Sequence, residues 1–276
     1  MVGAPARARV WLADYAPPPY SVESIELSVE LDPDLTRIAC SQVMVRANQP
    51  AGADLVLTGR GFRLNSIAID GRPLLPNEYL IREGELVLVS PPERFVLATV
   101  TEISPRANRA ALGMFMDGPA IITHMEADGF SRLVYCLDRP DIMSRYDVRL
   151  IADPVKFPVL LSNGERVDQG AMPDGRHFAL WRDTTPKSSY IFGIAAGPYA
   201  RLSDVHVDGG GRSIALTAYA SPANIARCRF LLGAIKRVMT WDEEAFGRKY
   251  DLDSLNILVV ETQAISQENK GLIFLE

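Results

Sequence analysis

The sequence has little cysteine, little histidine and no long apolar run. Its 276 residues include 3 cysteines and 3 histidines. Cys40, Cys136 and Cys228 lie far apart without C-x-x-C spacing, so a disulfide framework or a thiolate metal site has little support, and we expect reduced, mostly buried thiols. The start, Met1 to Arg7, lacks the apolar core of a signal peptide, and no later run reaches the roughly 20 apolar residues of a spanning helix. These absences predict a cytoplasmic protein.

Blocks of like charge are also missing. The formal net charge is -5, from 29 basic and 34 acidic residues that are scattered along the chain. Nucleic acids and anionic membrane surfaces are usually bound by concentrated basic patches, and single strands also need interleaved aromatic residues. We therefore expect neither a nucleic acid nor a membrane as a partner.

The first two hundred residues carry the pattern of β-strands. From Ile25 to Leu31, apolar residues alternate with Glu26, Ser28 and Glu30, which is the period of a strand with one wet face. Short segments rich in branched residues follow at about ten-residue spacing, separated by turn signals, at 39–45, 55–57, 64–69, 86–89 and 95–103. The fold class predicted is mainly β, with an antiparallel β-sandwich or saddle-like sheet in this region.

Turn signals add detail to this prediction. Asp70-Gly71 marks a hairpin, because the tight turn that suits strand twist needs positive φ. Asp208 to Gly211 marks a second hairpin, between strands at 205–207 and 214–219. Ser221-Pro222 then predicts the start of a helix, as N-cap and first-turn proline.

That helix is expected to end at Gly247 and to present one apolar face. The residues of this face are Ile225, Cys228, Leu232, Ile235 and Met239. Strands are expected at 255–260 and 272–275. Gly197-Pro198 interrupts the pattern, so we place a domain boundary there, between an antiparallel β domain (1–197) and an α+β segment (198–276). The last strand ends at Glu276 without a cap or a strand partner, so we expect a truncated fragment of a longer protein.

Gln267-Glu268-Asn269-Lys270-Gly271 is the last of several motifs that occur in collinear order along the chain. These motifs resemble those of the aminopeptidase N family of zinc metallopeptidases, in which this loop reads G-A-M-E-N with a bacterial Lys-Gly extension. The likeness begins at about Tyr15, and the chain resembles the amino-terminal portion of a bacterial aminopeptidase N. The resemblance implies a β domain followed by the beginning of a thermolysin-like catalytic domain. The other matching segments are 102–105, 126–130, 135–141, 161–164, 241–247 and 250–253.

The resemblance implies that Glu126 and Glu268 bind the α-ammonium group of a peptide amino terminus. Two converging carboxylates supply charge-assisted hydrogen bonds that an internal peptide nitrogen cannot exploit. It also implies a cis peptide bond between Glu126 and Ala127. Taken without the resemblance, an isolated glutamate is most often a solvated surface residue.

Three further residues are implied to line the substrate site: His124, Gln267 and Asn269. His124 stands where the bacterial enzymes usually have a glutamine, and the alternative is a partly buried histidine satisfied by backbone. Gln267 replaces a methionine that cushions the first substrate side chain. Ile265-Ser266-Gln267 stands in place of Gly-Ala-Met, and a β-branched isoleucine restricts φ and adds bulk. Either the loop is shifted or the protein is degenerate.

The metal site of the family is not found in these residues. The H-E-x-x-H motif, a more distant glutamate and a tyrosine would lie beyond Glu276, and His177 and His206 lack ligand spacing. We therefore expect no catalytic residue, no metal and no cofactor in this chain, zinc in the full-length protein, and no hydrolysis by the chain alone. The expected partners are peptide amino termini and the remainder of the catalytic domain.

Three readings of function remain. The first is a fragment of a zinc-dependent aminopeptidase that supplies the amine-binding carboxylates. The alternative is a non-catalytic, peptidase-like binding or scaffold module, for which Ile265-Ser266-Gln267 is the best support. A free-standing sandwich that binds carbohydrate or peptide is a weaker third. The charged motifs at 138–141 and 241–244 are expected to form structural ion pairs and caps.

Overall fold

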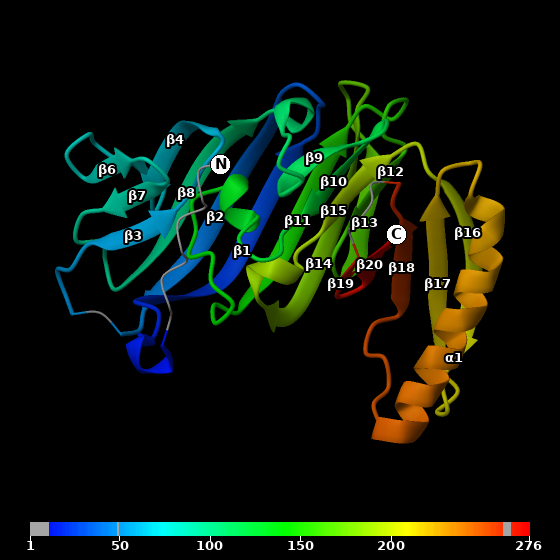
Figure 1. Cartoon of the computed structure of the whole chain (residues 1–276). Helices are drawn as coiled ribbons and strands as arrows, with labels where there is room; N and C mark the ends of the chain where they lie inside the picture. Colours follow the sequence, from blue (N-terminus) through cyan, green and yellow to red (C-terminus); the bar gives the residue numbers. More distant parts are fainter. Residues whose placement is uncertain (1–10, 49, 262–265) are drawn as a thin grey trace, which may run out of the picture.

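The chain folds mainly into β-strands, which the computed structural model arranges in four sheets (Figure 1). It describes residues 11–48, 50–261 and 266–276. The predictions made for Met1 to Arg7 and for Ile265 fall outside these residues. Within them, no helix is both long enough and apolar enough to cross a membrane. The mainly β fold class is confirmed.

The largest sheet has eight strands and is mostly antiparallel. Its order is β13 (Glu165–Ala171), β14 (His177–Lys187), β11 (Ser144–Ala152), β1 (Tyr20–Glu30), β2 (Thr36–Arg46), β8 (Arg94–Ile103), β4 (Arg63–Ile69) and β5 (Arg72–Pro73). Only the pair of β1 and β11 is parallel among these described strands. Asp70 and Gly71 between β4 and β5 have φ of 50° and 78°, which confirms the predicted hairpin.

Two smaller sheets share one hydrophobic core with the large sheet. The first contains β12 (Val159–Ser162), β15 (Ile194–Gly197), β10 (Ala120–His124) and β9 (Gly113–Asp117). The second contains β3 (Leu55–Thr58), β7 (Glu85–Leu88) and β6 (Tyr79–Arg82). Phe130, Tyr135 and Tyr146 are buried in this core, as are Cys40 and Cys136, and all three cysteines are free and buried as expected.

The fourth sheet mixes parallel and antiparallel pairs. Its order is β16 (Ala200–Val207), β17 (Ser213–Ala220), β18 (Ser254–Val259), β20 (Leu272–Leu275) and β19 (Gln267–Asn269). One face packs under helix α1 (Cys228–Phe246) in a core of its own, with Leu216 and Ile257. The other face contributes Tyr219, Leu258 and Phe274 to the large core, so this sheet is packed against the β-sandwich.

Helix α1 begins later than predicted. Ser221 O accepts hydrogen bonds from the backbone N–H groups of Asn224 (2.9 Å) and Ile225 (3.1 Å), and a 3₁₀ turn η5 (Ile225–Arg227) precedes the helix. Serine followed by proline suits a turn as well as a helix start, which explains the error. The predicted end is confirmed, because Gly247 has φ 65° and donates to Glu243 O. The predicted apolar face packs on the second core.

Short 3₁₀ turns connect the other elements. They are η1 (Leu12–Asp14), η2 (Pro105–Ala107), η3 (Phe130–Arg132) and η4 (Ser189–Ile191). The predicted domain boundary at Gly197-Pro198 falls between β15 and β16, which belong to different sheets. The division into domains at this point stays a prediction.

Candidate functional site

The first part of the candidate site is the turn that follows β10. Thr123 near the end of β10 is fully buried, and its Oγ1 accepts a hydrogen bond of 2.8 Å from Ile194 N. After it, Gly129 N donates to Met125 O (2.8 Å), which closes the turn. Glu126 lies in this turn with an exposed side chain, and the Glu126-Ala127 bond is cis. The Glu126 carboxylate forms no hydrogen bond or ion pair with any described residue.

The second part is the edge strand β19. Gln267 and Asn269 are buried, with 3% and 2% exposure, whereas Glu268 between them is exposed. Since side chains alternate along a strand, burial of its two neighbours turns Glu268 outward. Gln267 Nε2 donates to Tyr190 O. Like Glu126, Glu268 has no polar partner within the described part of the chain.

Residues 189–194 connect the two parts. Ile194 is bonded to Thr123, and the preceding Gly193 lies against Asn269 so closely that a Cβ on Gly193 would come within 2.7 Å of Asn269 Nδ2. The end of β10 and strand β19 therefore both contact residues 189–194. Gln267 Oε1 and both polar atoms of the Asn269 side chain are buried without a hydrogen-bond partner among the described residues.

Asn163 contributes to this arrangement, although its side chain was not singled out in the sequence. It is 1% exposed. Its Oδ1 accepts from Gly193 N (2.6 Å), and its Nδ2 donates to Ile191 O (3.1 Å) and Lys270 O (3.2 Å). Asn163 therefore ties residues 189–194 to the turn after β19. The available signal was an asparagine followed by glycine directly after an apolar strand.

Asp138 is a half-buried acid near this segment. Its carboxylate accepts hydrogen bonds from Ser131 N (2.8 Å) and Ser189 Oγ (2.7 Å). Burial raises the pKa of Asp138, and the hydrogen bonds from Ser189 and Ser131 oppose that shift. Arg139 and Asp141 beside it form an ion pair of 2.6 Å. These contacts confirm the prediction that the 138–141 motif is structural.

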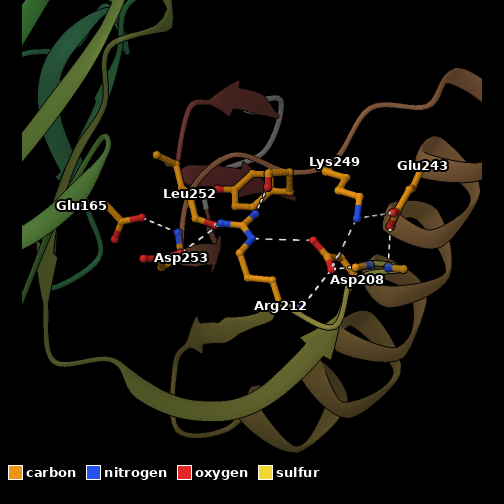
Figure 2. A network of polar contacts seen from close by, with 10 residues as sticks. Glu165, Asp208, Arg212, Glu243, Lys249, Leu252 and Asp253 are labelled. Carbon is orange, nitrogen blue, oxygen red and sulfur yellow. Dashed lines mark hydrogen bonds and ion pairs between the residues drawn. The ribbon is translucent and has the colours of Figure 1, made fainter.

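A network of polar contacts fixes the fourth sheet and the end of α1 (Figure 2). Asp208 accepts from Arg212 N (2.9 Å), and this bond is the largest cause that holds its pKa below the usual value. Glu243 on α1 accepts from Gly209 N (3.0 Å), which confirms the structural role predicted for the 241–244 motif. Arg212 also bonds Asp253 at 3.0 Å.

The same network reaches the large sheet through Glu165 on β13. Its Oε1 accepts from Asp253 N at 2.6 Å (Figure 2). Its Oε2 accepts from Ser254 Oγ at 3.1 Å, at the start of β18. Glu165 thus links the sandwich to the sheet that carries Glu268.

The histidines contact backbone carbonyl groups or lie in the interior. His124 is half-buried with Nδ1 3.2 Å from Ala111 O, and His177 has Nε2 2.8 Å from Phe157 O. His206 is buried. Within residues 11–48, 50–261 and 266–276, no three His, Cys, Asp or Glu side chains are grouped so that they could hold a metal ion. These residues therefore do not fit a zinc ion.

Comparisons with known proteins agree with the fold. Residues 115–191 match the model of the Peptidase M1 N-terminal domain. Aminopeptidase N of Caulobacter vibrioides is 44% identical over 95% of this chain and 30% of its own length, and that of Escherichia coli is 40% identical over 94% and 30%. The chain spans about 30% of the length of these curated relatives.

Solved structures show the same likeness. Aminopeptidase A of Legionella pneumophila, in complex with aspartic acid, superimposes with a TM-score of 0.89 at 27% identity, over 95% of this chain and 31% of that one. An M1 zinc metallopeptidase of Deinococcus radiodurans has a TM-score of 0.76 at 16% identity, over 92% and 60%, and shows the fold alone. Over nearly all of its length the chain is thus similar to the amino-terminal portion of the bacterial aminopeptidase N proteins, and its central part matches the amino-terminal domain of M1 peptidases.

Proposed function

We propose that this chain supplies the carboxylates that bind the α-amine of a peptide in a zinc-dependent aminopeptidase, and that these are Glu126 and Glu268. The observation that carries the proposal is their common support. Both are exposed acids on segments attached to residues 189–194, and neither has a counter-charge among the described residues. An ammonium group would provide that charge and donate hydrogen bonds to both carboxylates.

The alternation along β19 supports this role, because it turns Glu268 outward while Gln267 and Asn269 face the interior. Buried polar atoms normally have a hydrogen-bond partner, and an unsatisfied one costs about 1–3 kcal/mol. The free amide atoms of Gln267 and Asn269 therefore suit ordered water on the inner side of the strand. His124, two residues before Glu126, is the proposed third side of the amine pocket. A protonated imidazole there would repel the substrate ammonium group.

Catalysis itself is proposed for the whole protein and not for these 276 residues. The H-E-x-x-H motif is absent from the sequence, and the described residues do not fit a zinc ion. We propose that zinc is bound by the remainder of the catalytic domain, which would pack on the segment 198–276, and that the whole protein releases amino-terminal residues from peptides in the cytoplasm.

The amine-binding role can be tested on the chain itself with leucinamide, which offers an α-ammonium group and no carboxylate. We expect leucinamide to shift the NMR resonances of residues 189–194 and of β19, and N-acetyl-leucinamide to have no effect. Glu126→Gln and Glu268→Gln should each weaken binding by about tenfold or more, since a hydrogen bond to a charged group contributes roughly 1.5–3 kcal/mol. Glu83→Gln, which changes an exposed acid in another turn, is the matched control. Equal binding of the acetylated compound would refute the proposal.

A further inference from the structure

A second pocket lies where three sheets meet, separate from the residues assigned above. It has a volume of about 140 Å³ and lies between β12, the pair β13 and β14, and the pair β16 and β17. Its polar lining residues are Arg166, Gln169, His177, Arg201 and Tyr219. The volume is well above the roughly 10–15 Å³ that a single water needs, so the pocket can hold a small molecule.

Arg166 faces the interior side of the large sheet. It is the cross-strand partner of Trp181, so the two side chains lie on the same face. Trp181 is 2% exposed and its Nε1 donates to Leu160 O in β12, which identifies that face as the one covered by the four-stranded sheet. The Arg166 guanidinium lies 5.9 Å from the centre of the Trp181 ring. An arginine at the edge of an apolar core is thus directed into the pocket.

Arg201 enters the pocket from the opposite sheet. It pairs across β16 and β17 with Tyr219, whose ring belongs to the large core rather than to the core under α1. Arg201 therefore lies on the face that meets the sandwich. Burial raises the pKa of Tyr219, and the charges of Arg166 and Arg201 both oppose that shift. The charges of two guanidinium groups from different sheets thus lower the pKa of the same tyrosine hydroxyl.

The pocket contains positive charge and no neutralising acid. No aspartate or glutamate lines it, and neither Arg166 nor Arg201 forms an ion pair or side-chain hydrogen bond with a described residue. His177, the other titratable lining residue besides Tyr219, is bonded to Phe157 O. Two like charges directed at one cavity repel each other unless an anion lies between them. Other arginines of the large sheet pair with acids, as Arg182 does with Asp147 and Arg94 with Glu23.

We propose that Arg166 and Arg201 form a binding site for an oxyanion, either inorganic phosphate or the phosphate or carboxylate group of a small metabolite. The planar guanidinium groups can bind such oxygens in bidentate fashion. Gln169 and the Tyr219 hydroxyl supply neutral donors beside them. A bound oxyanion would join β13 to β16 and so connect the sandwich to the fourth sheet. This site is independent of the amine-binding role of Glu126 and Glu268.

The test is a calorimetric titration of the 276-residue protein with sodium phosphate and, separately, with sodium acetate, at constant ionic strength set by sodium chloride. We expect saturable binding of at least one of the two at one site per chain. Tighter binding of phosphate would identify a phosphate site, and tighter or equal binding of acetate a carboxylate site. Leucinamide carries no anionic group and should not compete, so this result is distinguishable from a failure of the amine proposal.

Substitutions of the two arginines test whether the oxyanion binds between them. Arg166→Gln and Arg201→Gln should each weaken it by about tenfold or more, because each removes charge-assisted hydrogen bonds. Arg82→Gln, which changes an exposed arginine on the distant strand β6, should leave the affinity unchanged. Since Arg166 also contacts Trp181, Arg166→Lys provides a second variant that keeps the charge and should bind more weakly than the parent. Absence of saturable binding, or wild-type affinity in both glutamine variants, would overturn the proposal.

Discussion

Replacement of Asn163 by alanine should destabilise the protein strongly, because one small side chain satisfies three backbone groups. Removing it leaves Gly193 N, which lies in the interior, without its 2.6 Å acceptor, and leaves Ile191 O without its 3.1 Å donor. The cost for Lys270 O is smaller, because it still accepts from Gly164 N at 3.1 Å.

The size of the effect follows from these three groups. A buried donor left unsatisfied costs about 1–3 kcal/mol, and the loss of an ordinary hydrogen bond costs about 0.5–1.5 kcal/mol. Asn163→Ala should therefore lower the free energy of unfolding by about 2–4 kcal/mol. For a chain of this size, that corresponds to a fall in the melting temperature of roughly 5–10 °C.

The assay is urea unfolding followed by circular dichroism, with linear extrapolation to water. Asn77→Ala is the matched control, since Asn77 is exposed and a surface substitution should change the free energy of unfolding by no more than about 0.5 kcal/mol. The affinity for leucinamide should also fall, because residues 189–194 lose one of their attachments. If the free energy of unfolding of Asn163→Ala equals that of the control, these hydrogen bonds make no net contribution to stability.

Two further outcomes can be measured. The hydrogen bond from the Arg72 guanidinium lowers the pKa of Glu78 from 4.5 to about 2. The stability that this pair contributes should therefore be complete above pH 4.5 and should be lost as the pH falls from 4.5 to about 2. An NMR titration of the Glu78 carboxyl with a midpoint near 4.5 would contradict this prediction. Gly271→Ala should destabilise by more than Gly211→Ala in thermal melts. Both glycines have positive φ, which costs alanine about 1–2 kcal/mol, but only at Gly271 would the new Cβ meet backbone, 2.8 Å from Gly164 O.

Features set by neighbouring residues could be predicted from the sequence. The alternation at 25–31, the positive φ at Asp70 and Gly71, and the glycine that ends α1 depend on local geometry, and all are present. The start of α1 was misplaced because Ser221-Pro222 fits a turn and a helix equally well. Local signals of this kind locate elements better than they locate their first residues.

Features set by distant residues could not be predicted. Strand β15 (Ile194–Gly197) contains two alanines and a glycine, which have weak strand propensity, and it is held as a strand by pairing with β10 on one side and β12 on the other. The contacts of Asn163 with Lys270 and of Glu165 with Asp253 join residues that are far apart in the chain. The sequence resemblance pointed to the candidate glutamates but not to the residues that hold them in position.

The turn between β12 and β13 helps to attach the sheet that carries Glu268 to the rest of the molecule. Asn163 and Gly164 in this turn both bond Lys270 O, and Glu165 at the start of β13 accepts from Asp253 N. Asn163 also fixes Gly193, beside the residue that bonds the end of β10. If Glu126 and Glu268 bind an amine as proposed, changes in this turn should therefore alter amine affinity without touching a carboxylate.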